Sequence, residues 1–121
     1  MDKKLKTPYG VLDLKIYTYP NKRIAILLYN SDGELFDDLT INLPNLSIND
    51  IDEGFISSNI DILTSDDFNM IDTLKKEDII STTFGKRGYN FGSYEYVKFN
   101  LDVLKEYDNE GYTNFIKEVE V

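Results

Sequence analysis

The sequence predicts an α+β domain in which an antiparallel sheet of four to six strands carries one or two helices on one face. Three observations predict it: apolar residues alternate within the first 45 positions, a hairpin-type turn separates two apolar runs, and helical spacings follow in the second half. The chain has 121 residues, which is long enough for one domain with a core of its own. We therefore expect a single domain over residues 1–121.

The N-terminal part predicts a three-stranded antiparallel meander. Residues 11–17 alternate, with Leu12, Leu14 and Ile16 on one face, which is typical of a half-buried strand. Residues 24–29 (IAILLY) are apolar throughout and indicate a central strand covered on both faces. The two strands are joined by a turn at the sequence YPNKR.

The third strand of this meander follows a strong hairpin signal, Asp32-Gly33. Residues 34–43 are expected to form it and Pro44 to end it. The alternation places Leu39, Ile41 and Leu43 inward and Thr40 and Asn42 outward. A short strand is also expected at residues 55–57.

The second half predicts short helices between strands. Ser65 is expected to cap a helix, with Asp66 and Asp67 in its first turn. Phe68, Ile71 and Leu74 would share its buried face, and Lys75 and Lys76 would lie in its last turn. Residues 78–84 and 93–101 are predicted to form strands. Residues 101–107 have helical spacing, which is expected to break at Gly111.

Residues 84–96, FGKRGYNFGSYEY, combine three glycines, two adjacent basic residues and five aromatics. Such a segment could bind nucleic acid by stacking and charge, with Lys86, Arg87, Tyr89 and Phe91 as the candidate residues. Two positive charges on a chain of net charge −9 supply little of the electrostatic attraction that such binding needs. The GKRG stretch matches the GxxG of a KH domain, but it lies between strands and not between helices. We therefore predict a turn at 85–88 that leads into an aromatic strand.

The composition argues against catalysis. The chain contains no histidine and no cysteine, which removes the usual general base near neutral pH, thiolate nucleophiles and the commonest metal ligands. A calcium loop around Gly54 fails because Ile51 would occupy a ligand position. We expect no enzyme activity, no cofactor and no metal site. No apolar run approaches 18 residues and no signal-type segment begins the chain, so we expect a cytoplasmic protein without membrane contact.

Acidic residues are concentrated in the middle of the chain. Residues 30–78 contain thirteen acidic side chains and only two basic ones. Carboxylates presented on a rigid sheet and helix can imitate a phosphate backbone and bind a basic protein surface, although a solvated face that maintains solubility is an equally available interpretation. The candidate partner-binding residues are Asp37, Asp38, Asp50, Asp52, Glu53, Asp61, Asp66 and Asp67.

Four stretches of the N-terminal half carry a family resemblance. They are GVLDL (10–14), AILL (25–28), DGE (32–34) and LTINLP (39–44). In this order they resemble an uncharacterised family of small proteins carried by Gram-positive conjugative elements and phages. The resemblance implies a family-like core over residues 1–99 and a C-terminal helical extension over 100–121.

The same resemblance implies a role against host defence, as in anti-CRISPR proteins. Together with the acidic segment it predicts a non-enzymatic accessory protein of a mobile element or phage. The expected partner is a host protein with a basic nucleic-acid-binding surface, such as a CRISPR effector in the bacterial cytoplasm. The alternatives are a nucleic-acid-binding protein using residues 85–96 and a plain interaction module, including a homodimer through an edge strand.

Overall fold

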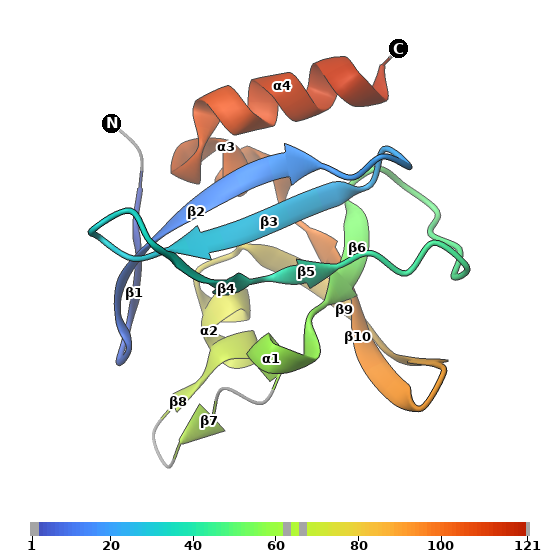
Figure 1. The fold of residues 1–121 in the computed structure, drawn as a ribbon, viewed down its shortest axis with the longest axis horizontal. Coiled ribbons are helices and arrows are strands. Elements are labelled where there is room, and N and C mark those ends of the chain that lie inside the picture. Colours follow the sequence, from blue (N-terminus) through green and yellow to red (C-terminus); the bar gives the residue numbers. More distant parts are fainter. Residues whose placement is uncertain (1–2, 62–63, 66–67, 121) are drawn as a thin grey trace.

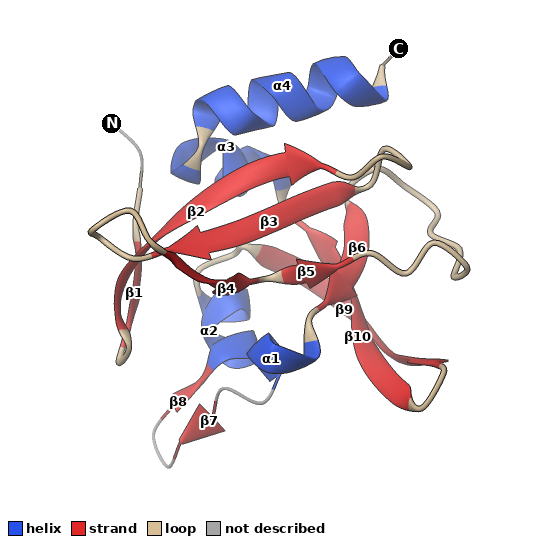
Figure 2. Cartoon of the chain, viewed as in Figure 1, coloured by secondary structure: helices blue, strands red, loops and turns tan. Residues whose placement is uncertain are grey.

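The computed structural model describes residues 3–61, 64–65 and 68–120, with the side chains of 59, 61, 64 and 65 left aside. It confirms the α+β class. The strands form two four-stranded antiparallel sheets, where the sequence predicted one, and the helices pack around them (Figures 1 and 2). Among the described residues, no helix is both long and apolar enough to cross a membrane.

The first sheet has the strand order β1-β2-β3-β4 and contains the predicted meander. Its strands are β1 (Leu5–Thr7), β2 (Gly10–Thr18), β3 (Ile24–Tyr29) and β4 (Leu35–Asp38). The predicted hairpin turn is present, with Gly33 at φ 87, a conformation that glycine adopts without strain. The buried face of β2 carries Leu12, Leu14 and Ile16, as the alternation predicts. Strand β1, which the sequence did not predict, pairs with the first part of β2.

The predicted third strand is divided between the two sheets. Its first part is β4, and its second part is β5 (Thr40–Ile41), which pairs with the second sheet. Leu39 lies between them, fully buried, and its N–H donates to Ile26 at 2.9 Å. Thr40, predicted to point outward, is buried: its hydroxyl oxygen accepts the N–H of Ile26 at 3.0 Å and is bonded to the Tyr19 hydroxyl. The alternation rule fails here because the crossing strand is covered on both faces.

The second sheet has the order β5-β6-β10-β9. It adds β6 (Glu53–Ile56), β9 (Ile80–Tyr89) and β10 (Gly92–Phe99) to β5. A short pair, β7 (Thr64–Ser65) and β8 (Phe68–Asn69), stands apart. The main core is made by both sheets together with the helices. It includes Leu12, Leu14, Ile16, Ile26, Leu28, Leu39, Ile56, Leu74, Val97, Phe99, Leu104, Tyr107 and Phe115.

The first helices follow β6. A single turn, α1 (Ser58–Asp61), precedes α2 (Met70–Lys76). The prediction that Ser65 caps this helix is wrong, because α2 begins five residues later with Asn69 as its cap, whose side chain accepts the N–H of Asp72 at 3.0 Å. Of the three predicted buried positions, Ile71 and Leu74 are confirmed, whereas Phe68 lies on β8 before the helix and is half-buried. The two lysines of the last turn are also confirmed. The predicted first-turn acids, 66 and 67, lie outside the described residues.

Two helices end the chain, α3 (Leu101–Tyr107) and α4 (Asn109–Val119). The predicted break at Gly111 is wrong. The chain bends at Asp108, which caps α4, and Gly111 lies within the first turn of that helix. Helix α4 runs along β2 (Figure 1), and Phe115 and Tyr107 reach the main core. Residues 101–119 are therefore built into the same core as the meander.

The β9–β10 hairpin projects from the body of the molecule (Figure 1). The predicted turn at 85–88 is wrong, since these four residues lie inside β9 and pair with residues 93–96 of β10. The turn is formed by Asn90 and Phe91, with Asn90 at φ 54. Gly85, at φ 93, instead accommodates a bulge, in which Phe84 is the extra residue of β9. A two-residue turn needs a residue that tolerates positive φ, and asparagine provides it here.

Candidate functional site

The acidic residues singled out from the sequence lie in separate parts of the structure. Asp37 and Asp38 are on β4 in the first sheet, and Asp38 is exposed. Asp50 is exposed in the loop before β6. The side chains of 61, 66 and 67 lie outside the described residues. The described candidates therefore form two groups, one on β4 (Asp37 and Asp38) and one in the loop before β6 and at its first residue (Asp50, Asp52 and Glu53).

The second of these groups is a tight carboxylate cluster. One carboxylate oxygen each of Asp50, Asp52 and Glu53 lie within 4.8 Å of one another. These are the described residues that could hold a divalent cation through oxygen ligands. Lys98 lies 3.4 Å from one oxygen of Asp52, and the other oxygen of Asp52 is buried without a hydrogen-bond partner. Lys98 therefore balances part of the negative charge of this cluster.

Glu53 does not belong to an acidic surface, because only 4% of it is exposed. Its carboxylate accepts a hydrogen bond from the hydroxyl of Tyr96 and another, at 2.8 Å, from the N–H of Asn49. Burial alone would raise the pKa of Glu53. The bonds from Tyr96 and from the backbone of Asn49 and Asp50, with the nearby Lys98, outweigh burial and lower that pKa. Glu53 thus fastens the loop before β6 to strand β10.

Tyr96 is also the centre of an aromatic stack on one face of the second sheet. Its ring stacks on Phe55 of β6, with ring centroids 5.1 Å apart. On the β9 side its cross-strand partner is Gly85, which has no side chain to cover the ring. Phe84 packs against the ring instead, at 4.8 Å between centroids, and the guanidinium carbon of Arg87 lies 4.7 Å from its centroid. The base of the hairpin is therefore rigidly attached to the body.

In the distal half of the hairpin, residues 84–92, every residue is exposed except Tyr89, which is half-buried against the cluster of Leu43, Phe55 and Tyr96. Phe91, at the turn, has a relative exposure of 109%, and Phe84 one of 45%. Arg87 lies directly across the ladder from Tyr94, on the face that holds the stack, whereas Lys86 lies across from Glu95 on the opposite face. The four residues proposed for nucleic-acid contact are thus all in the hairpin, but its two basic residues point to opposite sides.

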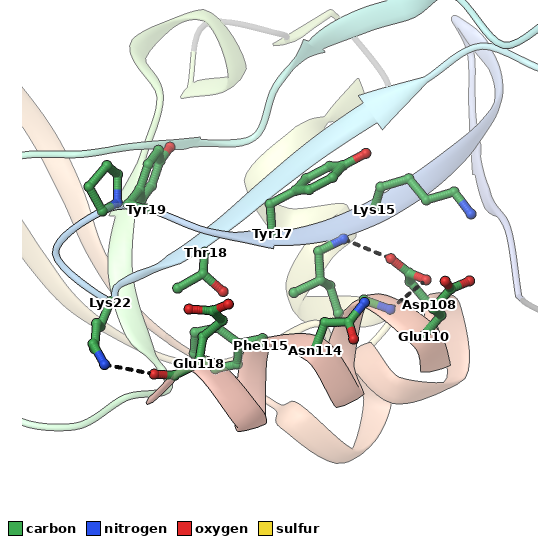
Figure 3. Close-up of a pocket in the computed structure, with 13 residues that line it drawn as sticks. Lys15, Tyr17, Thr18, Tyr19, Lys22, Asp108, Glu110, Asn114, Phe115 and Glu118 are labelled. Carbon is green, nitrogen blue, oxygen red and sulfur yellow. Dashed lines mark hydrogen bonds between the residues drawn. The ribbon is translucent and has the colours of Figure 1, made fainter. Parts of the chain in front are cut away.

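A groove lies between β2 and α4 (Figure 3). Its volume is about 590 Å³, in the range of small-molecule sites. The groove is lined by Lys15, Ile16, Tyr17, Thr18, Tyr19, Pro20, Lys22, Asp108, Glu110, Gly111, Asn114, Phe115 and Glu118.

The polar groups at the two ends of this groove hold α4 against β2. At one end Asp108, only 6% exposed, accepts the N–H of Ile16 at 2.9 Å and that of Gly111 at 3.1 Å. At the other end Lys22 donates to the carbonyl oxygen of Glu118 at 3.0 Å (Figure 3). Asp108 therefore closes the part of the β2 edge that β1 leaves unpaired, and its carboxylate is occupied by the fold.

Comparison with known proteins gives one result. The family model of a domain of unknown function, DUF4313, matches residues 11–119. The chain belongs to the DUF4313 family. No curated protein and no solved structure gives a significant match. The matched part of the DUF4313 domain includes both the β9–β10 hairpin and the two C-terminal helices.

Sequence reasoning missed three features of this DUF4313 domain. The sequence predicts Phe84 as the last residue of a strand. Its contact with Tyr96 depends on a β-bulge, which the local sequence does not indicate. The buried Glu53–Tyr96 pair joins residues 43 positions apart and leaves no sequence signal. Asp108 could have been found, since an aspartate followed by an acidic residue, Glu110, in the next turn is typical of a helix start.

Proposed function

We propose that this DUF4313 protein is a non-enzymatic binding protein whose contact element is the distal half of the β9–β10 hairpin. The observation that carries the proposal is the full exposure of Phe91 at the turn of a hairpin whose base is anchored. A large apolar side chain held in water on a rigid support is available to fill a pocket of another molecule.

Two further features support a protein as the partner. The distal half combines phenylalanine, tyrosine and arginine, the residue types enriched at the centres of protein interfaces. The whole chain has no histidine or cysteine, and Glu53 and Asp108, the two buried carboxylates described above, are each bonded within the fold. Binding therefore accounts for the residues present better than catalysis does.

The test is to replace Phe91 by serine and to measure capture of binding partners by the tagged protein from an extract of its source cells. A central aromatic anchor contributes about 2 kcal/mol or more, so Phe91→Ser should reduce capture of the specific partner by a factor of about thirty. Leu35→Ser is the matched control, because Leu35 is also apolar and 54% exposed but lies on β4. Equal capture by wild type and Phe91→Ser would contradict the proposal.

A second candidate function is inhibition of a host nucleic-acid-handling defence machine, of the anti-CRISPR kind, through the acidic surface. It is favoured by the net charge of −9 and by two exposed carboxylates in separate groups, Asp38 on β4 with Asp37 next to it in the chain, and Asp50 in the loop before β6. Acidic side chains attract a basic nucleic-acid-binding surface at long range. In this version the protein is an accessory factor of a phage or mobile element.

This candidate is tested with a purified CRISPR effector of the host and a DNA-cleavage assay. Replacement of Asp37, Asp38 and Asp50 by lysine should abolish inhibition. The control replaces three exposed acidic residues elsewhere, Asp72, Glu77 and Asp102, by lysine. It therefore changes the net charge by the same amount. Equal loss in both variants would indicate an effect of net charge alone and would contradict a specific acidic surface.

A further inference from the structure

The hairpin presents one cation that the fold itself holds in position. The guanidinium of Arg87 lies over the ring of Tyr96, with 4.7 Å between its central carbon and the ring centroid. That ring is fixed from the other strand by Phe55 and through its hydroxyl by Glu53. Arg87 therefore packs on a surface that cannot rotate away, although the residue itself is exposed.

This arrangement determines what Arg87 can bind. A guanidinium over the face of an aromatic ring is attracted by the ring's π electrons and keeps five N–H donors available for other partners. Those donors match the two oxygens of a carboxylate in a bidentate pair. Because stacking has already restricted the side chain, less conformational entropy is lost when such a pair forms.

Apolar groups lie on the same part of the hairpin as this cation. Phe84, packed on the same Tyr96 ring, is nearly half exposed, and Phe91 is fully exposed at the turn. The complementary surface must offer an apolar pocket for the phenyl group of Phe91 and a negative charge within reach of Arg87, four positions earlier in the hairpin. Building on the proposed function, we propose that the hairpin binds a protein pocket bordered by an Asp or Glu carboxylate, with Phe91 in the pocket and Arg87 paired to the carboxylate.

The charges of the molecule favour a carboxylate over a phosphate polymer. A nucleic acid would require several phosphate contacts, and Lys86, the second basic residue, lies on the opposite face across from Glu95. The remaining chain is strongly acidic and would repel a polyanion. One guanidinium is enough for one carboxylate, so a single acidic residue at a pocket is the partner chemistry that fits.

The experiment first identifies the partner through the proposed contact itself. The full-length protein with the photo-crosslinking residue p-benzoylphenylalanine in place of Phe91 is irradiated in extract of its source cells, and the crosslinked protein is identified and purified. The same residue in place of Leu35 is the control. The dissociation constant of the purified partner is then measured for wild type, Arg87→Gln and Lys86→Gln.

Arg87→Gln should weaken binding at least tenfold, whereas Lys86→Gln, which removes the same charge from the opposite face, should change it less than threefold. In the partner, replacement of the acidic residue nearest the crosslinked site by arginine should weaken binding of the wild-type protein. Arg87→Glu in this protein should restore binding to that partner variant, because the two charges are then exchanged. This rescue is an effect that general damage to the hairpin would not produce.

Three other outcomes would contradict the role of Arg87, the proposed function, or the protein nature of the partner. Equal effects of the two glutamine variants, with Phe91→Ser still abolishing capture, would overturn the role of Arg87 and leave the proposed function standing. Crosslinking at position 91 no greater than at position 35 would overturn both. A nuclease-sensitive crosslink with a gel shift of a twenty-nucleotide oligothymidine, or sedimentation with phosphatidylglycerol-containing vesicles, would replace the protein pocket with a nucleic acid or a lipid surface.

Discussion

The groove beside α4 and the tip of the β9–β10 hairpin are two contrasting surfaces of this molecule. The groove is concave and large enough for a ligand, but Asp108 and Lys22 at its ends are bonded to the fold. The hairpin tip is convex, and Phe91 lies entirely in water. The polar groups at the two ends of the groove are therefore bonded within the fold, whereas Phe91 at the hairpin tip is exposed.

This difference shows that a depression is a weak indicator of function when its polar groups have partners. The β2 edge beyond β1 would otherwise expose backbone groups to pairing with other chains, and α4 closes it through Asp108. The free edge at β9 is protected in another way, by a bulge at Phe84 and by two basic residues. Antiparallel pairing of two β9 edges around residues 86–87 would bring these charges together, which disfavours contact between two copies at this edge.

The largest expected effect tests the structural role of the groove. A Cβ atom at Gly111 would lie 2.1 Å from a carboxylate oxygen of Asp108 and 2.6 Å from the carbonyl oxygen of Ile16. Gly111→Ala should therefore separate α4 from β2 and lower the free energy of unfolding by about 3 kcal/mol, the sum of overpacking and a weakened charged hydrogen bond. Urea unfolding monitored by circular dichroism measures this. Alanine normally stabilises a helix, so the expected sign is opposite to propensity.

Gly88→Ala is the matched control for this substitution. The nearest atom to a Cβ at Gly88 is a backbone oxygen 4.0 Å away, and the residue is exposed in β9. Its free energy of unfolding should change by less than about 0.5 kcal/mol. If Gly111→Ala is no less stable than Gly88→Ala, Asp108 does not hold α4 against β2. The groove between these two elements could then serve as a binding site.

An intermediate effect is expected at the base of the hairpin. Tyr96→Phe removes the hydroxyl that donates to the buried Glu53 and should lower the free energy of unfolding by about 1–3 kcal/mol near neutral pH. The pH dependence identifies the cause. The pKa of Glu53 is lowered in the folded protein, so the stability it contributes is present above the ordinary glutamate pKa of about 4.3 and is lost as the pH falls through the lowered folded pKa.

The difference in unfolding free energy between wild type and Tyr96→Phe should therefore shrink as the pH falls from 5 to 3. Urea unfolding across that range measures it, and Tyr94→Phe, on the same face of β10, serves as the control. A difference that is constant with pH would mean that the hydroxyl acts through packing and not through the ionised carboxylate of Glu53.

Local patterns in the sequence were sufficient for the elements whose partners are close along the chain. The meander of β2, β3 and β4 was predicted because alternation and the Asp32-Gly33 turn are local signals. The crossing of the chain from β4 to β5 could not be predicted, since Thr40 is buried by Tyr19 and Ile26, residues brought there by the fold. The presence of a second sheet depended on the same crossing.

The candidate site was predictable in composition but not in geometry. Residues 84–96 were recognised as unusual from their glycines, aromatics and basic pair. The bulge at Phe84, the continuation of β9 through residues 85–88 and the turn at Asn90 decide which side chains share a face, and they depend on pairing with β10. For the acidic residues, the sequence also gives no geometry. Asp50 and Glu53 lie in the same acidic segment, but only Glu53 is buried and bonded to Tyr96.

The smallest expected effect on stability tests the tip directly. Phe91→Ser should change the free energy of unfolding by less than about 0.5 kcal/mol, because Phe91 is fully exposed and contributes no burial to the fold. The same variant is expected to lose its partner, so stability and binding should separate at this residue, in contrast to Gly111. Thermal and urea unfolding of Phe91→Ser beside wild type measure the first quantity. A decrease of more than about 1 kcal/mol in the free energy of unfolding would mean that Phe91 packs against the rest of the protein in solution. The hairpin tip would then contribute to stability, as the contacts of α4 with β2 do.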